Sequence, residues 1–275
     1  MTNDTCIVAV DVGNSAVKLC VQRGDGSPVL GRDAVDTDDS LIDHAIAIDA
    51  ADWQRDAMRW VSQRVGCRTA HWRIASVHRR AADELERAIQ ESIPRDSDAF
   101  TVSRVTRDDV PMKACVSQPD RLGIDRLLGA YAAVQRYGSP IVVVDAGSAV
   151  TIDWVDSSQQ FCGGAILPGL RLQTEVLASG TDALPEIDWH DVIAGRGPAT
   201  NTSDAIRLGV LTGVAAAIDR LAGQYAEMSS SPQKQAQMVV TGGDSPAISP
   251  YLRHLHKIVP NLVCRGLLDL PRSSN

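Results

Sequence analysis

A repeated motif constrains the fold of this chain more than any other feature. The stretch "IVAVDVGNSAV" aligns without gaps with "IVVVDAGSAVT", which begins about halfway along the chain, so that Asp11 falls on Asp145 and Gly13 on Gly147. A chance match is one reading, because a buried strand that ends at Asp and Gly is a common exit from a sheet. The other reading is a pair of similar α/β halves that face each other across a cleft, each presenting one acidic turn to a shared ligand.

Composition sets the class of protein. The chain has 275 residues, 44% hydrophobic and 22% charged, enough for a substantial core and for one large or two modest domains. No apolar run approaches the roughly 18 residues of a membrane span, and the first six residues lack the features of a secretory signal. We therefore expect a cytoplasmic protein without a membrane partner. The net charge of -7 gives no global attraction to nucleic acid, so no nucleic-acid partner is expected either.

Metal-ligating residue types are scattered along the chain. The six cysteines include no CxxC pair, so they indicate neither a zinc ribbon nor a disulfide framework, and we expect most of them to be small buried hydrophobes. His254 and His256 flank Leu255, but no carboxylate or cysteine neighbour completes a ligand set. A solvated helix end is the favoured interpretation of this histidine pair.

Alternating element signals predict the fold class. Short runs rich in Val and Ile that stop at Gly, Asp or Pro predict strands, and longer amphipathic segments between them predict helices. The predicted strands are "CIVAVDVG", "RIASV", "PIVVVDAG", "AVTIDWV", "GGAILPG" and "QMVVTGGD". The predicted helices are "AADELERAIQESIP", "GIDRLLGAYAAVQRYG" and "TSDAIRLGVLTGVAAAIDRLAGQYAEM", and "SSSPQKQ" is a predicted loop. This alternation is typical of the α/β class.

The turn after the first strand has a composition that suits phosphate. Gly13 permits a positive φ and a close backbone approach to a ligand, while Asn14 and Ser15 add short donors. Asp11 and Asp145 would repel a bare polyphosphate, so a cation such as Mg²⁺ is expected between acid and anion. The sequence has no P-loop and no dinucleotide fingerprint, so hairpin turns would hold the phosphates. Taken alone, "DVGNS" also fits a purely structural hairpin turn.

A second candidate lies in "GIDRLLGAYAAVQRYG", which places Asp125 and Arg126 in the first turn of a predicted helix. One interpretation is structural, an acid that favours the helix dipole beside a solvated arginine. In a phosphate-binding cleft, Asp125 instead becomes a candidate base that accepts the proton of a substrate hydroxyl, and Arg126 would bind an anion. Phosphoryl transfer tolerates a weak base because it depends mainly on positioning and charge neutralisation.

Further glycine-rich strand exits add weaker signals. In "CGGAILPGL", Gly163 and Gly164 indicate either close packing against a neighbour or contact with a ligand. "TGGD" fits a loop over which a nucleotide base or ribose lies. In "GPATNTSDAIRLG", either Thr202 or Ser203 is expected to cap the following helix, leaving the other hydroxyl to face the cleft.

Taken together, these motifs resemble the type III pantothenate kinases, members of the acetate and sugar kinase, Hsp70 and actin superfamily. "DVGNS" is similar to the first phosphate motif of that family, "PDRLGIDR" to its substrate and catalytic motif, and "DAGSAVTID" to its second phosphate motif. "GGAILPG", "NTSDAI" and "TGGD" follow in the expected order along nearly the whole chain. The resemblance implies two RNase H-like halves with a central cleft, the first spanning residues 1–120 and the second residues 121–275.

The resemblance also implies a reaction and its residues. The reaction transfers the γ-phosphoryl group of ATP to the primary hydroxyl of pantothenate, the first step toward coenzyme A. Asp125 matches the general base, Asp145 the ligand of a monovalent cation, and Thr202 a substrate contact. The implied pantothenate contacts also include Gly123, Ile124, Asp125 and Arg126. The implied ATP contacts are Asp11, Val12, Gly13, Asn14, Ser15, Ala16, Val17, Lys18 and Ser148. Mg²⁺ or another divalent cation, K⁺ or NH₄⁺, and a homodimer are implied as well.

Three positions depart from the family pattern. Val116 stands where the family usually has a tyrosine that contacts pantothenate, Ser148 replaces a threonine, and Ile124 replaces a smaller residue. The missing tyrosine leaves open a related kinase that acts on a sugar or another hydroxyl compound. A nucleotide-binding regulator that lost turnover is a third hypothesis, and the joint presence of Asp11, Asp125 and Asp145 argues against it.

Overall fold

A computed structural model describes residues 5–23, 42–64, 69–92, 100–187, 189, 197–228 and 236–271. The chain forms two compact units, each assembled from separated stretches of sequence. Unit 1 consists of Met1–Pro111, Arg121–Ala132 and Asn261–Asn275, and unit 2 consists of Met112–Asp120 and Ala133–Pro260. The chain therefore passes from one unit to the other several times, once within helix α3 (Ile124–Tyr137).

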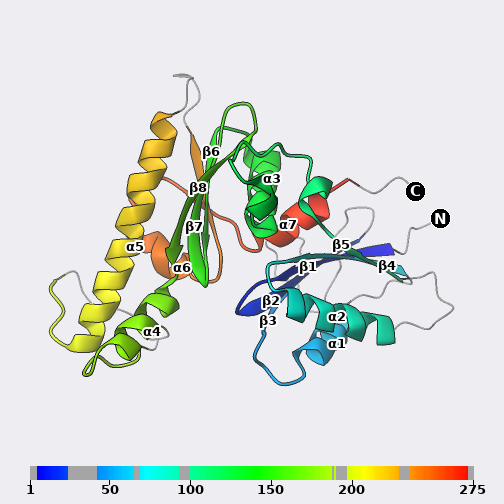
Figure 1. The fold of residues 1–275 in the computed structure, drawn as a ribbon, viewed down its shortest axis with the longest axis horizontal. Coiled ribbons are helices and arrows are strands. Elements are labelled where there is room, and N and C mark those ends of the chain that lie inside the picture. The colour runs from blue at the N-terminus through cyan, green and yellow to red at the C-terminus, as the bar shows by residue number, and fades with distance from the viewer. Residues whose placement is uncertain are drawn as a thin grey trace. The chain divides into compact units, whose positions relative to one another are not determined.

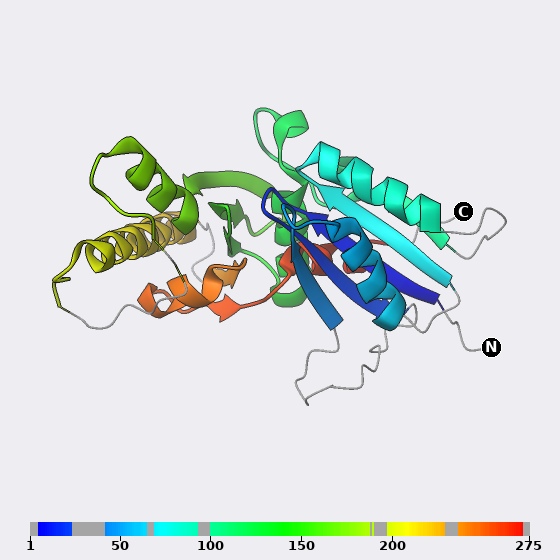
Figure 2. The ribbon, with the colours of Figure 1, turned by 90° about the horizontal axis from the view of Figure 1, so that it is seen from below.

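Unit 1 is built on a five-stranded sheet with the order β3-β2-β1-β4-β5 (Figure 1). Its strands are β1 (Thr5–Val12), β2 (Ala16–Arg23), β3 (Ile42–Ala47), β4 (Thr69–Ser76) and β5 (Phe100–Arg104). Helices α1 (Trp53–Arg64) and α2 (Arg79–Ser92) cover one face, and α7 (Leu262–Asp269) packs on the other against β1, β2 and β4 (Figure 2). Because both faces are covered, β1 is buried along almost its whole length rather than on alternate residues.

The two faces of β1 have different neighbours. Cys6, Val8, Val10 and Val12 belong to the apolar core that also contains residues of α1 and α2. Side chains alternate along a strand, so Asp11 lies on the opposite face, the one that α7 covers. The acid is therefore set against the C-terminal helix.

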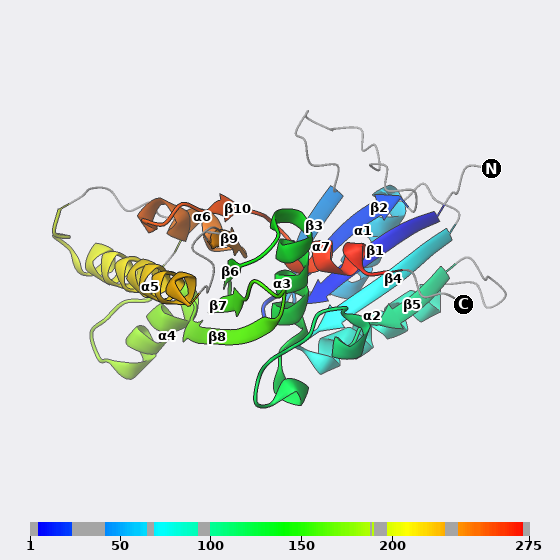
Figure 3. The same cartoon turned by 90° about the horizontal axis from the view of Figure 1, so that it is seen from above.

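Unit 2 repeats this plan with the strand order β10-β9-β6-β7-β8. Its strands are β6 (Ile141–Ala146), β7 (Ala149–Val155), β8 (Phe161–Pro168), β9 (Gln237–Thr241) and β10 (Lys257–Ile258). The helices α4 (Leu170–Gly180), α5 (Thr202–Glu227) and α6 (Ser245–Ile248) share an apolar core with β6, β7 and β9 on one face of the sheet (Figure 3). Short 3-10 turns occupy Arg107–Asp109, Pro119–Arg121 and Ser249–Tyr251.

The two sheets match in order and in strand direction. β1 pairs antiparallel with β2 and parallel with β4, and β6 pairs antiparallel with β7 and parallel with β9. This order, with one antiparallel hairpin beside parallel strands, is that of an RNase H-like half. The predicted duplication and the α/β class are confirmed.

The ungapped alignment holds only as far as the first glycine of each turn. Asp11 pairs across the hairpin with Lys18, whereas Asp145 pairs with Thr151, so the first hairpin is longer by one residue. The structural partner of Ala149, the first residue of β7, is therefore Ala16, the first residue of β2, and not Ser15.

Most predicted elements are present, and several others were not predicted. All six predicted strands and all three predicted helices are found, with Leu85 and Ile89 of α2 fully buried. Ile93, Pro94 and the predicted loop "SSSPQKQ" lie outside the described residues. The unpredicted elements are α1, α4, α6, α7, β2, β3, β5 and β10. No helix in the described ranges is long and apolar enough to cross a membrane.

The cysteine and histidine predictions need correction. Cys6, Cys20 and Cys264 are fully buried as expected, but Cys115 is exposed and Cys162 half-buried. Cys6 is disulfide-bonded, which the cysteine spacing did not indicate. His254 and His256 do not end a helix, because they lie between the 3-10 turn at Ser249–Tyr251 and β10.

Candidate functional site

The first acidic turn joins β1 to β2. Asp11 is 7% exposed, and it pairs with Lys18 directly across the antiparallel hairpin. The backbone N–H of Gly13 donates to the carbonyl of Ala16 at 3.0 Å and closes the turn, which leaves Asn14 exposed at its tip. The turn therefore presents a short donor side chain and backbone groups beside a buried carboxylate, an arrangement that suits phosphate oxygens.

Gly13 does not adopt the positive φ that a glycine permits. Among the described glycines, positive φ angles occur at Gly138, Gly163 and Gly242. Gly13 is favoured for another reason, since a Cβ there would lie 3.1 Å from the Ala16 carbonyl oxygen. Close approach of two backbone segments, rather than a left-handed conformation, accounts for this glycine.

Helix α7 lies behind the first acidic turn. The Cys264 thiol donates to the Lys18 carbonyl at 3.5 Å. A hydrogen bond with the Cys20 thiol, then burial, and to a smaller extent the Asp11 carboxylate raise the pKa of Cys264 well above its usual value. The C-terminal helix thus forms part of the wall around Asp11, which nothing in the sequence indicated.

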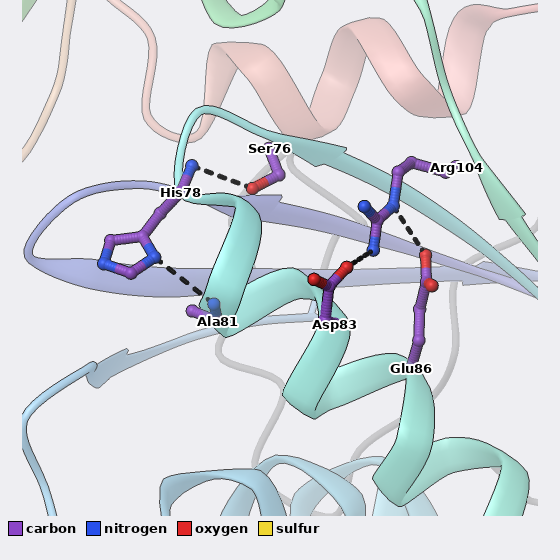
Figure 4. Close-up of polar contacts among 6 residues, drawn as sticks. All are labelled: Ser76, His78, Ala81, Asp83, Glu86 and Arg104. Atoms are coloured by element: carbon purple, nitrogen blue, oxygen red, sulfur yellow. Dashed lines mark hydrogen bonds and ion pairs between the residues drawn. The ribbon is translucent and has the colours of Figure 1, made fainter.

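The end of β4 lies beside the same turn. Ser76 pairs with Val12 in the parallel register, and the Val77 N–H donates to the Val12 carbonyl at 3.2 Å. The His78 N–H donates to the Ser76 hydroxyl at 2.9 Å, and the His78 ring Nδ1 accepts from the Ala81 N–H at 3.2 Å (Figure 4). His78 therefore caps α2 with its ring, at the carboxyl edge of the sheet where Asp11 lies.

An ion-pair network fixes α2 against the neighbouring strand. Arg104, at the end of β5, donates to Asp83 at 2.7 Å and to Glu86 at 2.8 Å, and both acids belong to α2 (Figure 4). One guanidinium with two carboxylates on successive turns holds the helix at a fixed angle to the strand. This network also helps to fix the carboxyl end of β4, because α2 begins a few residues after Ser76.

The start of α3 places the predicted base. Asp125 is half-buried, and its Oδ1 accepts from the Arg126 N–H at 2.9 Å in the first turn of the helix. A Cβ at Gly123 would overlap this same Oδ1. The carboxylate therefore lies over the space that the missing side chain leaves, in the first turn of the helix.

The segment that leads into α3 is tied to the 3-10 turn at Arg107–Asp109. The Arg107 guanidinium donates to the carbonyl of Leu122 at 3.1 Å, and Leu122 itself is buried. Within α3, Leu127, Leu128 and Tyr131 are buried. Anchors before and after Gly123 thus fix the backbone from which Asp125 projects.

Three loops meet around the second acidic turn, in unit 2. Asp145 is half-buried at the end of β6 and pairs with Thr241 of β9 in the parallel register. A Cβ at Gly242, where φ is +94°, would overlap the Ala146 carbonyl oxygen and lie 2.5 Å from Asp145 Oδ1. The Asp244 N–H donates to that same carbonyl at 2.9 Å. The "TGGD" loop therefore packs directly on the acidic turn.

The third loop of this group begins α4. The Gly169 N–H donates to the Ser148 carbonyl at 3.1 Å, and a Cβ at Gly169 would overlap the Gly147 carbonyl. Ser148 is exposed at the tip of the turn. Segments far apart in the sequence, around Ser148, Gly169 and Gly242, are thus brought together by glycines that permit backbone contact.

The predicted cap of α5 is wrong. Asn201 is the residue before the helix, and its side-chain oxygen accepts from the Asp204 N–H at 2.9 Å. Asn is among the best N-cap residues, and here it stands one position before Thr202 and two before Ser203. Thr202 is the first helical residue and is exposed, so its hydroxyl takes no part in this cap.

Val116 lies against β8. Its Cγ1 would be 3.6 Å from a Cβ at Gly163, an ordinary van der Waals distance. A Cβ at Gly164, by contrast, would overlap the Ile152 carbonyl and lie 2.6 Å from the side chain of Asp153. Close packing thus accounts for Gly164, the structural alternative at this motif, and Asp153 is a buried acid that sequence reasoning missed.

A second acid that was missed pairs with the first histidine. The Asp219 carboxylate accepts from His254 Nδ1 at 2.9 Å and from the N–H groups of Arg253 and His254 at 3.0 to 3.2 Å. Burial by itself would raise the pKa of Asp219, but these hydrogen bonds outweigh it and hold the pKa below its ordinary value. The group joins α5 to the loop before β10 and has a structural role.

Comparisons with known proteins identify the family. Residues 7–224 match the sequence profile of the family described as type III pantothenate kinase. The type III pantothenate kinase of Rhodopirellula baltica is 38% identical over 279 residues, covering 96% of this chain and 97% of the relative. That of Nitrosococcus oceani is 31% identical and covers 98% of this chain and 95% of the relative. That of Rubrobacter xylanophilus is 34% identical and covers 72% of this chain and 87% of the relative.

A solved structure shares the fold. A Campylobacter jejuni protein assigned to the Baf family of transcriptional activators superposes with a TM-score of 0.55 at 20% identity, covering 95% of each chain. This likeness shows the fold alone. Together with the profile match and the full-length relatives, the repeated sheet order and the ordered motifs lead to one conclusion: the chain belongs to the type III pantothenate kinase family.

Proposed function

We propose that this chain phosphorylates the primary hydroxyl of pantothenate with ATP, giving 4'-phosphopantothenate, the first step of coenzyme A biosynthesis. Membership of the family supports the reaction. The single observation that carries the assignment of the base is the Asp125 carboxylate, placed over side-chain-free Gly123 at the start of a helix.

Asp125 acts as the general base in this proposal. Its carboxylate accepts the proton of the pantothenate hydroxyl as the γ-phosphoryl group is transferred. The hydrogen bond from the Arg126 N–H leaves the second carboxylate oxygen for the substrate. Gly123, Ile124 and Arg126 form the surrounding substrate contacts, and the Arg126 guanidinium attracts the pantothenate carboxylate.

ATP is held by turns rather than by a P-loop. The proposal assigns the β1–β2 turn, residues 11–18, and Ser148 of the β6–β7 turn to the phosphates. Buried Asp11 and exposed Asn14 support the first assignment, and the packing of Gly169 and Gly242 against the second turn supports the other. Backbone N–H groups of such turns neutralise phosphate charge without a lysine-bearing loop.

The cations of the reaction fit the residues that the turns provide. Bound Mg²⁺, or a similar divalent ion, supplies charge neutralisation of the phosphate oxygens. Asp11, a carboxylate beside the proposed phosphate turn, is the hard oxygen ligand that such an ion or its water shell prefers. Next to Gly242, the Asp145 carboxylate lies close to the Ala146 carbonyl oxygen, and oxygen ligands of this kind suit K⁺ or NH₄⁺.

The monovalent-cation assignment has its own test. If Asp145 binds K⁺, replacing K⁺ by Na⁺ at constant ionic strength lowers turnover, because the smaller ion fits the same oxygen ligands less well. Asp145→Asn should remove most of this difference between the two salts. Equal rates of the unmodified enzyme in K⁺ and Na⁺ would contradict the assignment.

Thr202 and a second copy of the chain complete the proposed pantothenate site. Thr202 is exposed and outside the α5 cap, which leaves its hydroxyl accessible.

An exposed apolar area on β8 and α4 supports a homodimer. Its residues, Ile166, Leu172 and Val176, expose 45 to 61% of their surface. Light scattering after size-exclusion chromatography should give twice the 29.4 kDa of one chain. A monomer at micromolar concentration would refute the dimer.

A substrate panel separates this proposal from the related-kinase alternative that Val116 leaves open. Purified protein with ATP, Mg²⁺ and K⁺ should release ADP when pantothenate is added, and not with a set of sugars. ADP release with a sugar but not with pantothenate would favour the alternative. Absence of release with every acceptor, while ATP still binds, would favour a nucleotide-binding regulator.

A further inference from the structure

The segment before α3 runs beside the start of β8. The Phe161 N–H donates to the Lys113 carbonyl at 2.9 Å, and the Cys115 N–H donates to the Phe161 carbonyl at 2.7 Å. These two bonds form the parallel bridge between Ala114 and Phe161. Two residues further along, Val116 lies next to Gly163, so the two segments stay side by side.

This register places two cysteines opposite each other. Between the Ala114–Phe161 pair and the Val116–Gly163 pair lie Cys115 and Cys162. Segments paired in this way are separated by about 4.8 Å; because β8 is irregular between Phe161 and Gly164, with a φ of +92° at Gly163, the common face of the two thiols follows from their contacts with Gln160. That separation falls within the roughly 4.4–6.8 Å between Cα atoms that a disulfide requires.

Gln160 shows that both thiols lie on one face. The Cys115 thiol donates to the Gln160 side-chain oxygen, and the Cys162 thiol donates to the Gln160 carbonyl at 3.3 Å. Cys115 is exposed and Cys162 half-buried. Burial, then the Asp156 carboxylate, and to a smaller extent Cys115 raise the pKa of the Cys162 thiol. An oxidant in solution therefore meets Cys115 first.

We propose that Cys115 and Cys162 form a reversible redox modification site, with Cys115 as the reactive thiol and Cys162 as the resolving thiol. A small-molecule disulfide such as oxidised glutathione is the oxidant. The Cys115 thiolate attacks one glutathione sulfur and expels the other glutathione as a thiolate. The Cys162 thiolate then attacks the Cys115 sulfur and expels the second glutathione. Two protein thiols are oxidised to one disulfide, and one glutathione disulfide is reduced to two thiols.

The bond would act on a substrate-binding segment. It would hold residues 113–116 on β8, and Val116 occupies the position at which the family resemblance implies a pantothenate contact. This consequence rests on the proposed function, and it predicts that oxidation raises the KM for pantothenate more than it changes kcat. The modification itself does not depend on the kinase reaction.

Peptide mapping tests the site. The full chain is equilibrated with mixtures of reduced and oxidised glutathione, alkylated, and digested with trypsin without reduction. The peptide of residues 114–121, which carries Cys115, should become linked to the peptide that carries Cys162, and dithiothreitol should release it. A stable glutathione adduct on Cys115 without the linked peptide would overturn the pairing, as would two thiols that stay alkylatable under oxidised conditions.

Two serine variants sharpen the test. Cys162→Ser should stop at the glutathione adduct of Cys115, and Cys115→Ser should leave Cys162 largely unmodified. The KM for pantothenate should rise severalfold on oxidation of the unmodified chain but not of Cys162→Ser; an equal rise in both would remove the disulfide as its cause. Absence of kinase activity in the reduced chain would reject the proposed function, while peptide linkage would still decide the redox site.

Discussion

At the scale of single residues, the position of Asp125 depends on a side chain that is missing. Gly123 leaves open the space in which the Asp125 carboxylate lies, and no other residue would do so. Because the atom that a Cβ would meet is the end of a flexible side chain, the carboxylate and not the helix would give way. The glycine of the "GIDR" motif therefore positions the base.

Gly123→Ala tests this role. The added methyl group should turn the carboxylate away from its place and lower kcat by about 10- to 100-fold, since small displacements of reacting groups carry costs of this order. The midpoint of urea unfolding should change little. Gly129→Ala is the matched control on the same helix, because a Cβ there meets nothing within 4 Å. An unchanged kcat in Gly123→Ala would show that the carboxylate position is unimportant.

Asp219 provides a pH-dependent prediction. Its pKa is lower in the folded chain than in the unfolded one, so its contribution to stability is present above the ordinary carboxyl range and is lost as the pH falls through the folded pKa. Asp219→Ala should lower the free energy of unfolding by about 1–3 kcal/mol at pH 7, because the hydrogen bonds that Arg253 and His254 donate to a charged acceptor are lost. Urea titrations between pH 7 and pH 3 should show this difference shrinking with acidification. A difference that grows instead would contradict the sign.

Sequence patterns were most informative for residues that carry chemistry and least for residues that support them. Asp125 and Asp145 were identifiable because acid, glycine and apolar strand follow one another. Asp153 and Asp219 were not identifiable. Asp153 lies against the backbone at Gly164, and Asp219 pairs with His254, which is distant in sequence. The cap at Asn201 was missed because three candidate polar residues stand in a row, and only geometry selects among them.

At the scale of elements, the loop between β9 and α6 packs on the second acidic turn of unit 2. Gly242 combines a φ of +94° with contacts to Ala146 and Asp145 that leave no room for a Cβ. Its neighbour Gly243 has open space around a Cβ. Two adjacent glycines thus differ in what they require, and they form a matched pair.

Gly242→Ala should displace the loop and raise the KM for ATP by about tenfold or more, together with a loss of stability of about 1–3 kcal/mol from strain and overlap. Gly243→Ala should stay within about twofold of the unmodified enzyme. Steady-state kinetics at varied ATP, with thermal unfolding of each variant, measure both effects. Equal behaviour of the two variants would contradict the assignment of this loop to the nucleotide.

The helices that sequence reasoning missed are those with weak local signals. α7 is only eight residues long and is almost entirely buried, so it shows no polar face by which a pattern could reveal it. α4 follows directly on the glycine-rich end of β8, where turn signals dominate. Tertiary packing, not local preference, decides these elements, whereas the strongly patterned α2, α3 and α5 were predictable.

At the scale of the whole molecule, the repeated motif was the most predictive feature. It indicated two similar halves, and both sheets have the same strand order and directions. It did not reveal that unit 1 also contains the start of α3, from the middle of the chain, and α7, from the C-terminal end. Packing between segments that are distant in sequence decides which unit each of them joins. A local motif contains no information about such packing.

We propose that this family member transfers the γ-phosphoryl group of ATP to pantothenate with Asp125 as the base. Mass spectrometry of the product, with ATP, Mg²⁺, K⁺ and pantothenate present, tests it most directly. The unmodified protein should form 4'-phosphopantothenate in step with ADP. Asp125→Asn should fold normally and form 4'-phosphopantothenate at least about 10²-fold more slowly, since loss of a general base commonly lowers the rate by this factor. No phosphopantothenate from the unmodified protein, or a near-normal rate from Asp125→Asn, would contradict the account.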